Sequence, residues 1–312
     1  MILTVNLNPA LDRTTVVPDF NLGRIFRVPN MLSLPGGKGF NFARALRTLD
    51  KTCTNLVVGP FGGHIGRMVW DMAQTEGLTC DGVWIEGETR TCLSIVDPTT
   101  NCVTELYEAG PELHPDDWLS LADKIRNLLS EVTWLVLCGS PARGMPEDGL
   151  FDLLEWTHAA GVRTVLDTYG PPMARAIETG PYLVKINQHE ASSLLGWPVN
   201  NLTDALNAAR AIQFRGVKAV VITLGQDGAV GVDITGHSFG WLAPHTPGIS
   251  AVGSGDSFLA GIIVGLVKGQ ALENAVRLGI ATGAANTLQI GAAKFELPQV
   301  ESMLDIVQPL SF

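Results

Sequence analysis

The stretch Ala251-Val252-Gly253-Ser254-Gly255-Asp256-Ser257-Phe258-Leu259-Ala260-Gly261 joins a glycine-rich turn to an apolar run. Glycine adopts positive φ angles and has no side chain, so the backbone of this turn can come close to a ligand. The apolar run from Phe258 to Val267 has helical character. Since the first amides of a helix have no partner within that helix, the amides of residues 253–256 predict an anion-binding site.

An acidic side chain follows the glycine turn directly. Asp256 would lie beside the anion site, where a carboxylate can take a proton from a hydroxyl while the amides stabilise a phosphoryl group in transfer. A second interpretation is that Asp256 only favours the first turn of a core helix, where the helix dipole stabilises acidic residues. The motif is short enough to occur by chance, so the rest of the chain has to decide between these interpretations.

The composition limits the class of protein. The chain has 312 residues, of which 46% are hydrophobic, enough for one large α/β domain with an appendage or for two domains. Its net charge of −10 argues against partners such as nucleic acid or an anionic membrane. The five cysteines form no Cys-x-x-Cys motif, which favours free thiols in a reducing compartment. With no signal-peptide pattern and no apolar run long enough to span a bilayer, we expect a cytoplasmic protein.

The order of the expected elements predicts an α/β fold. From about residue 112 strands alternate with helices, which indicates a mostly parallel sheet covered on both faces, with its loops along one edge. Two β-rich regions, about 12–35 and 86–110, interrupt the pattern, and we expect them to pair into one small sheet, a lid over that edge. We therefore predict a single domain, residues 1–312, with this lid inserted in its core. Strands are expected at 2–7, 14–18, 25–34, 55–58, 91–96, 102–107, 134–138, 163–166, 182–186 and 219–223, and helices at 41–49, 65–74, 116–129, 147–159, 205–214, 256–267, 272–286 and 298–307.

Further polar residues lie where this topology would place a ligand. Asp12 follows an Asn-Pro turn after the first strand, where a carboxylate could accept hydrogen bonds from sugar hydroxyls or simply cap the turn. The segment Pro35-Gly36-Gly37-Lys38-Gly39-Phe40-Asn41 is not a P-loop, because a glycine follows its lysine. It is either a grip on a hydroxylated, phosphorylated ligand or a tight turn. In the β-rich regions, Arg27 would face away from its apolar neighbours, and Arg90 begins a strand, where it could be a solvated edge charge.

Eight short segments occur in one order along the chain: Asn8–Asp12, Gly36–Asn41, Gly87–Arg90, Glu108–Pro111, Gly139-Ser140, Lys185–Glu190, Thr223–Gly228 and Gly253–Asp256. Together they resemble the phosphofructokinase B branch of the ribokinase-like sugar kinases, essentially from end to end. The resemblance is greatest to the phosphohexose kinases of that branch, such as tagatose-6-phosphate kinase and 1-phosphofructokinase. It implies a ribokinase-like three-layer α/β/α core with a small β-sheet lid, and ATP and Mg2+ as cofactors.

The resemblance also implies a role for each matching residue. Asp256 would be the catalytic base, with Gly253, Ser254 and Gly255 as the anion hole. The residues implied to bind the substrate are Asp12, Gly37 and Asn41 at the sugar hydroxyls and Arg27, Lys38, Arg90 and Ser140 at the phosphate. Three cations meeting at one place would explain how an acidic protein binds a dianion.

The nucleotide side is implied in the same way. Lys185 and Asn187 would face the nucleotide phosphates, and Glu190 would face the magnesium ion. Thr223, Gly225 and Gly228 are implied to line the nucleotide site.

The expected function is therefore ATP-dependent phosphorylation of a ketohexose monophosphate to the bisphosphate. Tagatose 6-phosphate, fructose 1-phosphate and fructose 6-phosphate all remain open, because no single residue selects among them. The alternatives are a kinase for another sugar or a nucleoside, or a non-catalytic sugar-phosphate sensor on the same fold. A serine hydrolase is disfavoured because Val252 stands where Gly-x-Ser-x-Gly needs its first glycine. Exposed lid edges would favour a homodimer through the lid.

Overall fold

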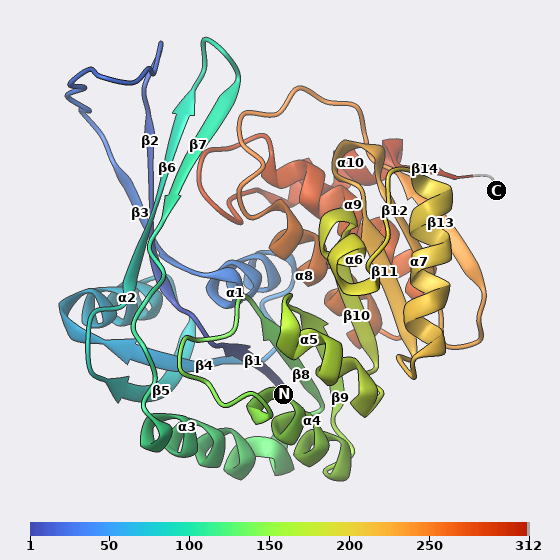
Figure 1. Ribbon diagram of the computed structural model, residues 1–312. Helices are drawn as coiled ribbons and strands as arrows, with labels where there is room; N and C mark the ends of the chain where they lie inside the picture. The colour runs from blue at the N-terminus through green and yellow to red at the C-terminus, as the bar shows by residue number, and fades with distance from the viewer. Residues whose placement is uncertain (311–312) are drawn as a thin grey trace.

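The computed structural model describes residues 1–310. Within these residues, the centre of the molecule is a sheet of ten strands (Figure 1). Its order is β14-β13-β12-β11-β10-β9-β8-β1-β4-β5. All neighbours from β5 to β11 are parallel, and β12, β13 and β14 are added antiparallel. The strands are β1 (Ile2–Asn6), β4 (Asn55–Gly62), β5 (Thr79–Ile85), β8 (Trp134–Cys138), β9 (Arg163–Asp167), β10 (Leu183–Asn187), β11 (Ala219–Thr223), β12 (Ala229–Val232), β13 (Ser238–Leu242) and β14 (Gln308–Pro309).

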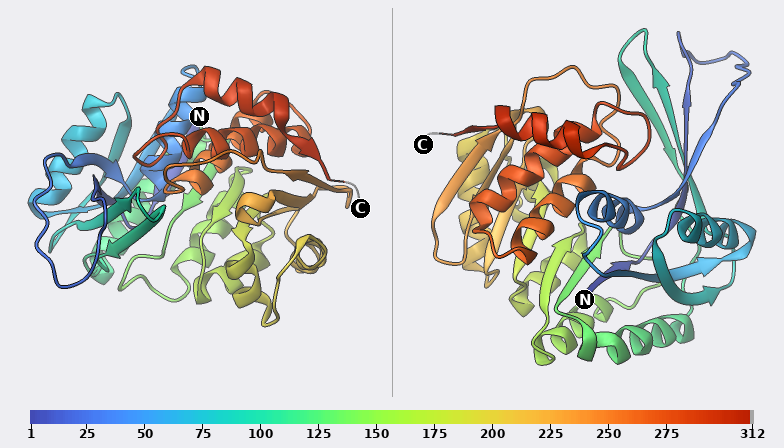
Figure 2. Two further views of the ribbon diagram at one scale, coloured as in Figure 1. Left: turned by 90° about the horizontal axis from the view of Figure 1, so that it is seen from above. Right: turned by 180° about the vertical axis from the view of Figure 1, so that it is seen from behind.

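Helices cover both faces of this sheet, which confirms the predicted three-layer α/β/α fold. Seen from behind in Figure 2, α1, α2 and α8 to α10 lie over one face, and α3 to α7 lie over the other. A hydrophobic core lies on each face of the sheet. Successive side chains of β1 point to opposite faces, so that Leu3 and Val5 pack in one core and Ile2 packs in the other. The helices are α1 (Lys38–Leu49), α2 (Gly63–Thr75), α3 (Pro115–Leu128), α4 (Gly149–Ala159), α5 (Pro171–Ala176), α6 (Gln188–Leu195), α7 (Leu202–Phe214), α8 (Ser254–Val267), α9 (Leu272–Asn286) and α10 (Leu297–Ile306).

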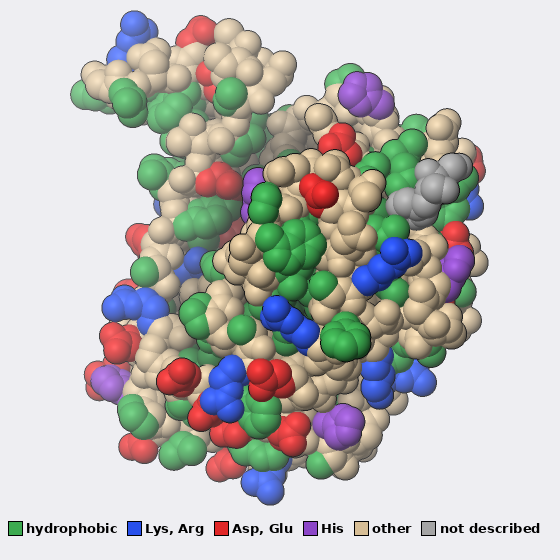
Figure 3. All heavy atoms as spheres, turned by 45° about the vertical axis from the view of Figure 1, so that its right-hand side comes forward, with side chains coloured by type: hydrophobic (Ala, Val, Ile, Leu, Met, Phe, Trp, Pro, Cys, Tyr) green, Lys and Arg blue, Asp and Glu red, His purple; other side chains and the backbone are tan. Residues whose placement is uncertain are grey.

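A second sheet of four strands, called the small sheet below, projects from this body (Figures 1 and 3). Its order is β3-β2-β6-β7, so the two β-rich regions do pair, as predicted. β2 and β6 run parallel, and the other two pairs are antiparallel. Apolar side chains gather on its projecting tip (Figure 3), where Leu22 and Ile25 are 93% and 86% exposed. The strands are β2 (Ala10–Val16), β3 (Leu32–Gly36), β6 (Arg90–Asp97) and β7 (Cys102–Tyr107).

The strand expected at 25–34 is wrong for most of its length. Only residues 32–36 form β3, and residues 24–28 have no regular structure, so Arg27 is exposed in a loop rather than on a strand face. The carboxylate of Asp97 accepts hydrogen bonds from the amides of Asp19 and Phe20 at 3.0 and 3.2 Å. These bonds turn the chain out of the sheet soon after β2 ends, so that the β-prone residues beyond have no strand to pair with.

Strand β5 was not expected from the sequence. Strand β4 ends four residues later than expected, at Gly62, and includes Pro60. Residues 55–58 of β4 pair with β1, whereas residues 59–62 pair only with β5. A proline has no amide hydrogen, so it is tolerated where a strand has a neighbour on one side only. Strand β5 is itself an edge strand of the large sheet, and most of its residues are half-exposed.

The parallel strands end together at one edge of the large sheet. Asn6, Cys138 and Asp167 are in register at the ends of β1, β8 and β9, and Asn187 pairs with Thr223 at the ends of β10 and β11. Ligands of open α/β sheets bind at this carboxyl edge. Within residues 1–310, none of the helices has both the length and the apolar character that a membrane crossing requires.

Candidate active site

The glycine turn is the beginning of helix α8. Gly253 is the N-cap, with a φ of 80°, and a Cβ placed on it would lie 2.7 Å from the amide nitrogen of Ala293. Among the described residues, the amides of Gly253, Gly255 and Asp256 have no hydrogen-bond acceptor, whereas that of Ser254 donates to the carbonyl of Ala251 at 3.1 Å. The turn therefore presents free amides at a helix N-terminus, which is the arrangement that binds an anion.

Asp256 lies in the first turn of α8 and is 6% exposed. Its side chain does not end in an apolar environment, because its Oδ2 accepts a hydrogen bond from the Asn41 amide at 2.9 Å. Burial, together with the charge of Asp167, raises the pKa of Asp256 to about 7, although Lys38, Lys185 and the Asn41 hydrogen bond all lower it. A carboxyl with this pKa can exchange a proton near neutral pH, which suits a general base.

Asp167, which the sequence interpretation did not select, joins two of the predicted residues. Its carboxylate is fully buried and accepts hydrogen bonds from Lys38 Nζ at 2.7 Å and Lys185 Nζ at 2.8 Å. Burial alone would raise the pKa of Asp167, but the two ammonium charges hold it below its usual value. Burial likewise would lower the pKa of Lys38, but the negative charges of Asp167, Asp256 and Glu190 raise it. The signal in the sequence was an acid at the end of a buried strand.

Part of the anion turn and three of the five predicted nucleotide residues line one cavity of about 280 Å³, whereas Lys185 and Asn187 do not line it. Gly255 leaves room for Lys185, since a Cβ on this glycine would lie 3.2 Å from Lys185 Nζ. A phosphate at the free amides would therefore also be close to this ammonium. The residues that line the cavity include Thr223, Gly225 and Gly228 together with Ser254 and Gly255.

Asn187 and Glu190 form the N-terminal cap of α6. The Asn187 side chain accepts hydrogen bonds from the amides of His189 and Glu190, and Glu190 Oε2 accepts one from the Asn187 amide at 2.8 Å. Glu190 Oε1 is 3.8 Å from Lys38 Nζ. Within residues 1–310, no three His, Cys, Asp or Glu side chains are grouped in a way that could hold a metal ion.

The predicted sugar-binding residues lie where β2 and β3 enter the core. Gly36 leaves room for Asp12, because a Cβ on it would be 2.1 Å from the Asp12 carboxyl carbon. Burial raises the pKa of Asp12 to about 6, against the charges of Arg44 and Arg90 and hydrogen bonds from Gly37 and Asn41. The structure thus brings Asp12, Gly37 and Asn41 together, next to Asp256.

The predicted phosphate ligands are only partly brought together. Arg90 Nη2 donates to the Asn8 carbonyl at 3.2 Å, and the Asn8 side chain donates to Ser140 Oγ at 3.0 Å. Arg90 Nε is buried, and it has no hydrogen-bond partner among the residues that the structure describes. Lys38, in contrast, is paired with Asp167, and Arg27 is exposed in the loop between β2 and β3. The expected meeting of three cations is therefore not present in this structure.

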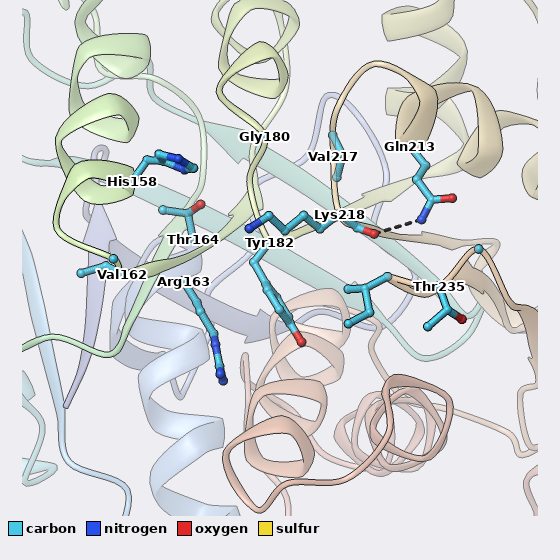
Figure 4. A pocket seen from close by; sticks show the side chains of 13 residues that line it. His158, Val162, Arg163, Thr164, Gly180, Tyr182, Gln213, Val217, Lys218 and Thr235 are labelled. Carbon is cyan, nitrogen blue, oxygen red and sulfur yellow. Dashed lines mark hydrogen bonds between the residues drawn. The ribbon is translucent and has the colours of Figure 1, made fainter.

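A larger cavity of about 740 Å³ lies at the opposite edge, where β9, β10 and β11 begin (Figure 4). The side chain of Lys218 extends across it, and the Lys218 carbonyl accepts a hydrogen bond from Gln213 at 2.9 Å. None of the predicted site residues lines this cavity. Size therefore does not identify the candidate site; the free amides, the buried carboxylates and the carboxyl edge of the sheet do.

The chain belongs to the pfkB family of carbohydrate kinases, whose pattern it matches over residues 7–299. It is thus an enzyme that transfers a phosphoryl group to a sugar hydroxyl, and both the fold and the family predicted from the sequence are confirmed. It is 32% identical over 291 residues to a 1-phosphofructokinase of Rhodobacter capsulatus, covering 93% of this chain and 91% of that protein. It is 29% identical over 295 residues to a tagatose-6-phosphate kinase of Staphylococcus epidermidis, covering 93% of both proteins.

Solved structures agree with this assignment. Phosphofructokinase-2 from Escherichia coli in complex with substrates and products superimposes with a TM-score of 0.90 at 28% identity, covering 97% of this chain and 98% of that one. A possible 1-phosphofructokinase from Thermotoga maritima has the same TM-score of 0.90 at 23% identity, which supports the fold alone.

Proposed function

We propose that this protein phosphorylates a ketohexose monophosphate to the bisphosphate with ATP as the donor. The observation that carries the proposal is Asp256, a buried carboxylate with a raised pKa beside three free amides of a helix N-terminus. The similarity to 1-phosphofructokinases and to tagatose-6-phosphate kinase supports the substrate class. Tagatose 6-phosphate, fructose 1-phosphate and fructose 6-phosphate all fit this class.

In the proposed reaction, Asp256 accepts the proton of the substrate hydroxyl. The hydroxyl oxygen forms a bond to the γ-phosphorus of ATP, the bond from that phosphorus to the β–γ bridging oxygen breaks, and ADP leaves. The free amides of the α8 turn and the ammonium of Lys185 stabilise the charge on the phosphoryl group in transfer, which is where such a reaction gains most. Asn41 and Asp12 hold the sugar hydroxyls, and Arg90 and Ser140 hold its phosphate.

Magnesium is part of the proposal, with Glu190 as its protein ligand. Glu190 Oε1 takes no part in the α6 cap and lies near Lys38 and the Asp167 network. One carboxylate suits Mg2+, which keeps several waters and takes its other ligands from nucleotide phosphates. The ion would neutralise phosphate charge on the ATP.

We also propose a homodimer formed through the small sheet. Its tip exposes apolar side chains such as Leu22 and Ile25, and Leu106 and Tyr107 of β7 are 59% and 54% exposed. Exposed apolar patches and free sheet edges are typical association surfaces. An Escherichia coli phosphofructokinase-2 has been described in a tetrameric inhibited form. A location in the cytoplasm stays a prediction from the composition.

The test is a substrate panel with ADP release as the readout. The protein is incubated with ATP and each of the three phosphosugars, with and without Mg2+, and with free fructose, ribose and adenosine as controls. We expect ADP and a bisphosphate with one or more phosphosugars, and only with Mg2+. Turnover of ribose or adenosine alone would indicate the alternative kinase, and binding of a phosphosugar without ADP release would indicate a sensor.

A further inference from the structure

Arg44 is a buried arginine next to the catalytic elements, and the proposed mechanism does not use it. It lies on α1, three residues after Asn41, and is 6% exposed. Residues three apart on a helix share a face, so Arg44 and Asn41 face the same side. Burial of a guanidinium is costly unless its donors are satisfied, which makes the identity of its partners informative.

The guanidinium donates to four acceptors in four parts of the chain. Nε donates to Glu76 Oε2 at 2.7 Å, and Nη2 donates to the Pro35 carbonyl at 2.7 Å. Nη1 donates to Asn41 Oδ1 at 3.2 Å and to the Ala292 carbonyl at 3.1 Å. An arginine can satisfy such a set because its five donors have a fixed planar geometry, whereas a lysine offers one nitrogen.

One of these bonds determines which way the Asn41 amide faces. Asn41 receives a hydrogen bond from Arg44 on its oxygen and donates one from its nitrogen to Asp256 Oδ2 at 2.9 Å. If the amide were turned over, two donors would face each other at Arg44, and an oxygen would face a carboxylate at Asp256. Arg44 therefore specifies the one orientation in which Asn41 supports the carboxylate of Asp256.

The two carbonyl partners connect the same guanidinium to both sides of the site. Pro35 lies in β3, where the small sheet enters the core beside Asp12. Ala292 packs against the anion turn, since a Cβ on Gly253 would lie 2.8 Å from the Ala292 Cα. Arg44 thus contacts β3 of the small sheet through Pro35, the hydrogen-bond donor to Asp256 through Asn41, and the residue packed against the α8 turn through Ala292.

We propose that Arg44 is a positioning residue for phosphoryl transfer, which acts through the Asn41 amide on Asp256. The inference rests on the proposed function, in which Asp256 is the base. A hydrogen bond to the charged carboxylate favours its ionised form. Loss of the correct amide orientation therefore leaves the Asp256 carboxylate less firmly held. It also raises the pKa of Asp256, so that the carboxylate is ionised only at higher pH.

The experiment measures kcat, KM and their pH dependence for Arg44→Lys, Asn41→Ala and the double variant. We expect each single change to lower kcat about 10- to 100-fold, the factor of a lost hydrogen bond to a charged group, with KM for ATP little changed. The acid limb of kcat should move to higher pH. Both changes remove the Arg44–Asn41 hydrogen bond, so if Arg44 affects kcat through this bond, the double variant should be no slower than Asn41→Ala alone.

Arg47→Met, an exposed arginine one turn further along α1, is the matched control and should match the wild type. Additive losses in the double variant, or an unchanged pH profile in Arg44→Lys, would overturn the inference even if the protein is the proposed kinase. If Arg44→Lys does not fold, Asn41→Ala still decides, since an unshifted kcat profile in it refutes the relay. An Asp256→Asn variant that keeps its turnover would remove the proposed base and this inference with it.

Discussion

The two ends of the candidate site are built in different ways. At the α8 end, Asp256, Asp167 and Lys185 are buried. Asp167 accepts a hydrogen bond from Lys185 at 2.8 Å, and Asp256 accepts one from Asn41 at 2.9 Å. At the small-sheet end, Arg27 is exposed, and Arg90 Nε has no hydrogen-bond partner within residues 1–310. The first end holds its polar groups in place for phosphoryl transfer, whereas the cations predicted for the second end lie apart. Substitutions should therefore affect turnover at the α8 end and substrate affinity at the small-sheet end.

The largest effect is expected from Asp256→Asn. The amide keeps the shape of the side chain but accepts no proton, and general-base catalysis contributes about 10²- to 10⁴-fold, so kcat should fall by this factor. ATP binding, measured by calorimetry, should persist because the α8 amides remain. Asp116→Asn, at the first turn of α3, is a control that should leave kcat unchanged. Near-normal turnover in Asp256→Asn would show that the base has been misassigned.

A somewhat smaller effect is expected from Asp167→Asn. The change leaves the buried ammonium of Lys185 and the half-buried ammonium of Lys38 without their carboxylate, and breaking a buried ion pair costs about 3–5 kcal/mol of unfolding free energy. It also removes a negative charge that raises the pKa of Asp256 and leaves Lys38 and Lys185 free to lower it. The acid limb of kcat should therefore move to lower pH, opposite to the shift expected for Arg44→Lys. If the pH at which kcat falls on the acid side does not change, Asp167 has only a structural role.

The wild-type enzyme should lose activity below neutral pH. Asp256 must be ionised to act as a base, and burial raises its pKa to about 7, so kcat/KM should fall about tenfold for each pH unit below that value. A plateau that persists to pH 5 would contradict a buried base.

The same shift makes a prediction about stability. Between its ordinary value of 3.8 and about 7, the folded state binds more protons at Asp256 than the unfolded state does. The contribution of Asp256 to the unfolding free energy therefore decreases as the pH rises through this window. Asp256→Asn should gain stability relative to the wild type at pH 8 and lose most of that advantage at pH 5, as urea unfolding would measure. An equal difference at both pH values would contradict the raised pKa.

Whether a strand or a site contact can be predicted from the sequence depends on how far apart in the chain the interacting residues lie. Strands β8 and β11 could be located within a residue because each is a short apolar run buried inside the sheet. The edge strand β5 could not, because its half-exposed residues include Asp81 and Gly82. The anion turn was visible because its chemistry lies in consecutive residues.

The contacts of Asp167 and Arg44 were not visible in this way. Lys38 is 129 residues from Asp167, and Arg44 is 248 residues from Ala292. Only the register of the sheet and the packing of α1 bring such groups together. The residue types were present in the sequence, but their partners are a property of the fold.

Arg90→Ala tests the small-sheet end. If Arg90 holds the substrate phosphate, KM for the phosphosugar should rise about 10-fold or more, the factor of a charged hydrogen bond, while KM for ATP stays nearly constant. Arg13→Ala, an exposed arginine on β2 of the same sheet, is the matched control. Equal changes in both KM values would refute the placement of Arg90 at the phosphate.

The smallest effect is expected from Arg27→Ala. Arg27 is exposed and makes no hydrogen bond or ion pair within residues 1–310. Because an exposed charge contact contributes only about 0.2–1 kcal/mol, KM for the phosphosugar should rise no more than about fivefold. Salt screens exposed charges more than buried ones, so this difference should vanish at high ionic strength while that of Arg90→Ala persists. A rise as large as that of Arg90→Ala would show that the phosphate draws Arg27 out of solvent. Substrate binding would then bring the loop between β2 and β3 into the site, and the two ends would differ less than their contacts suggest.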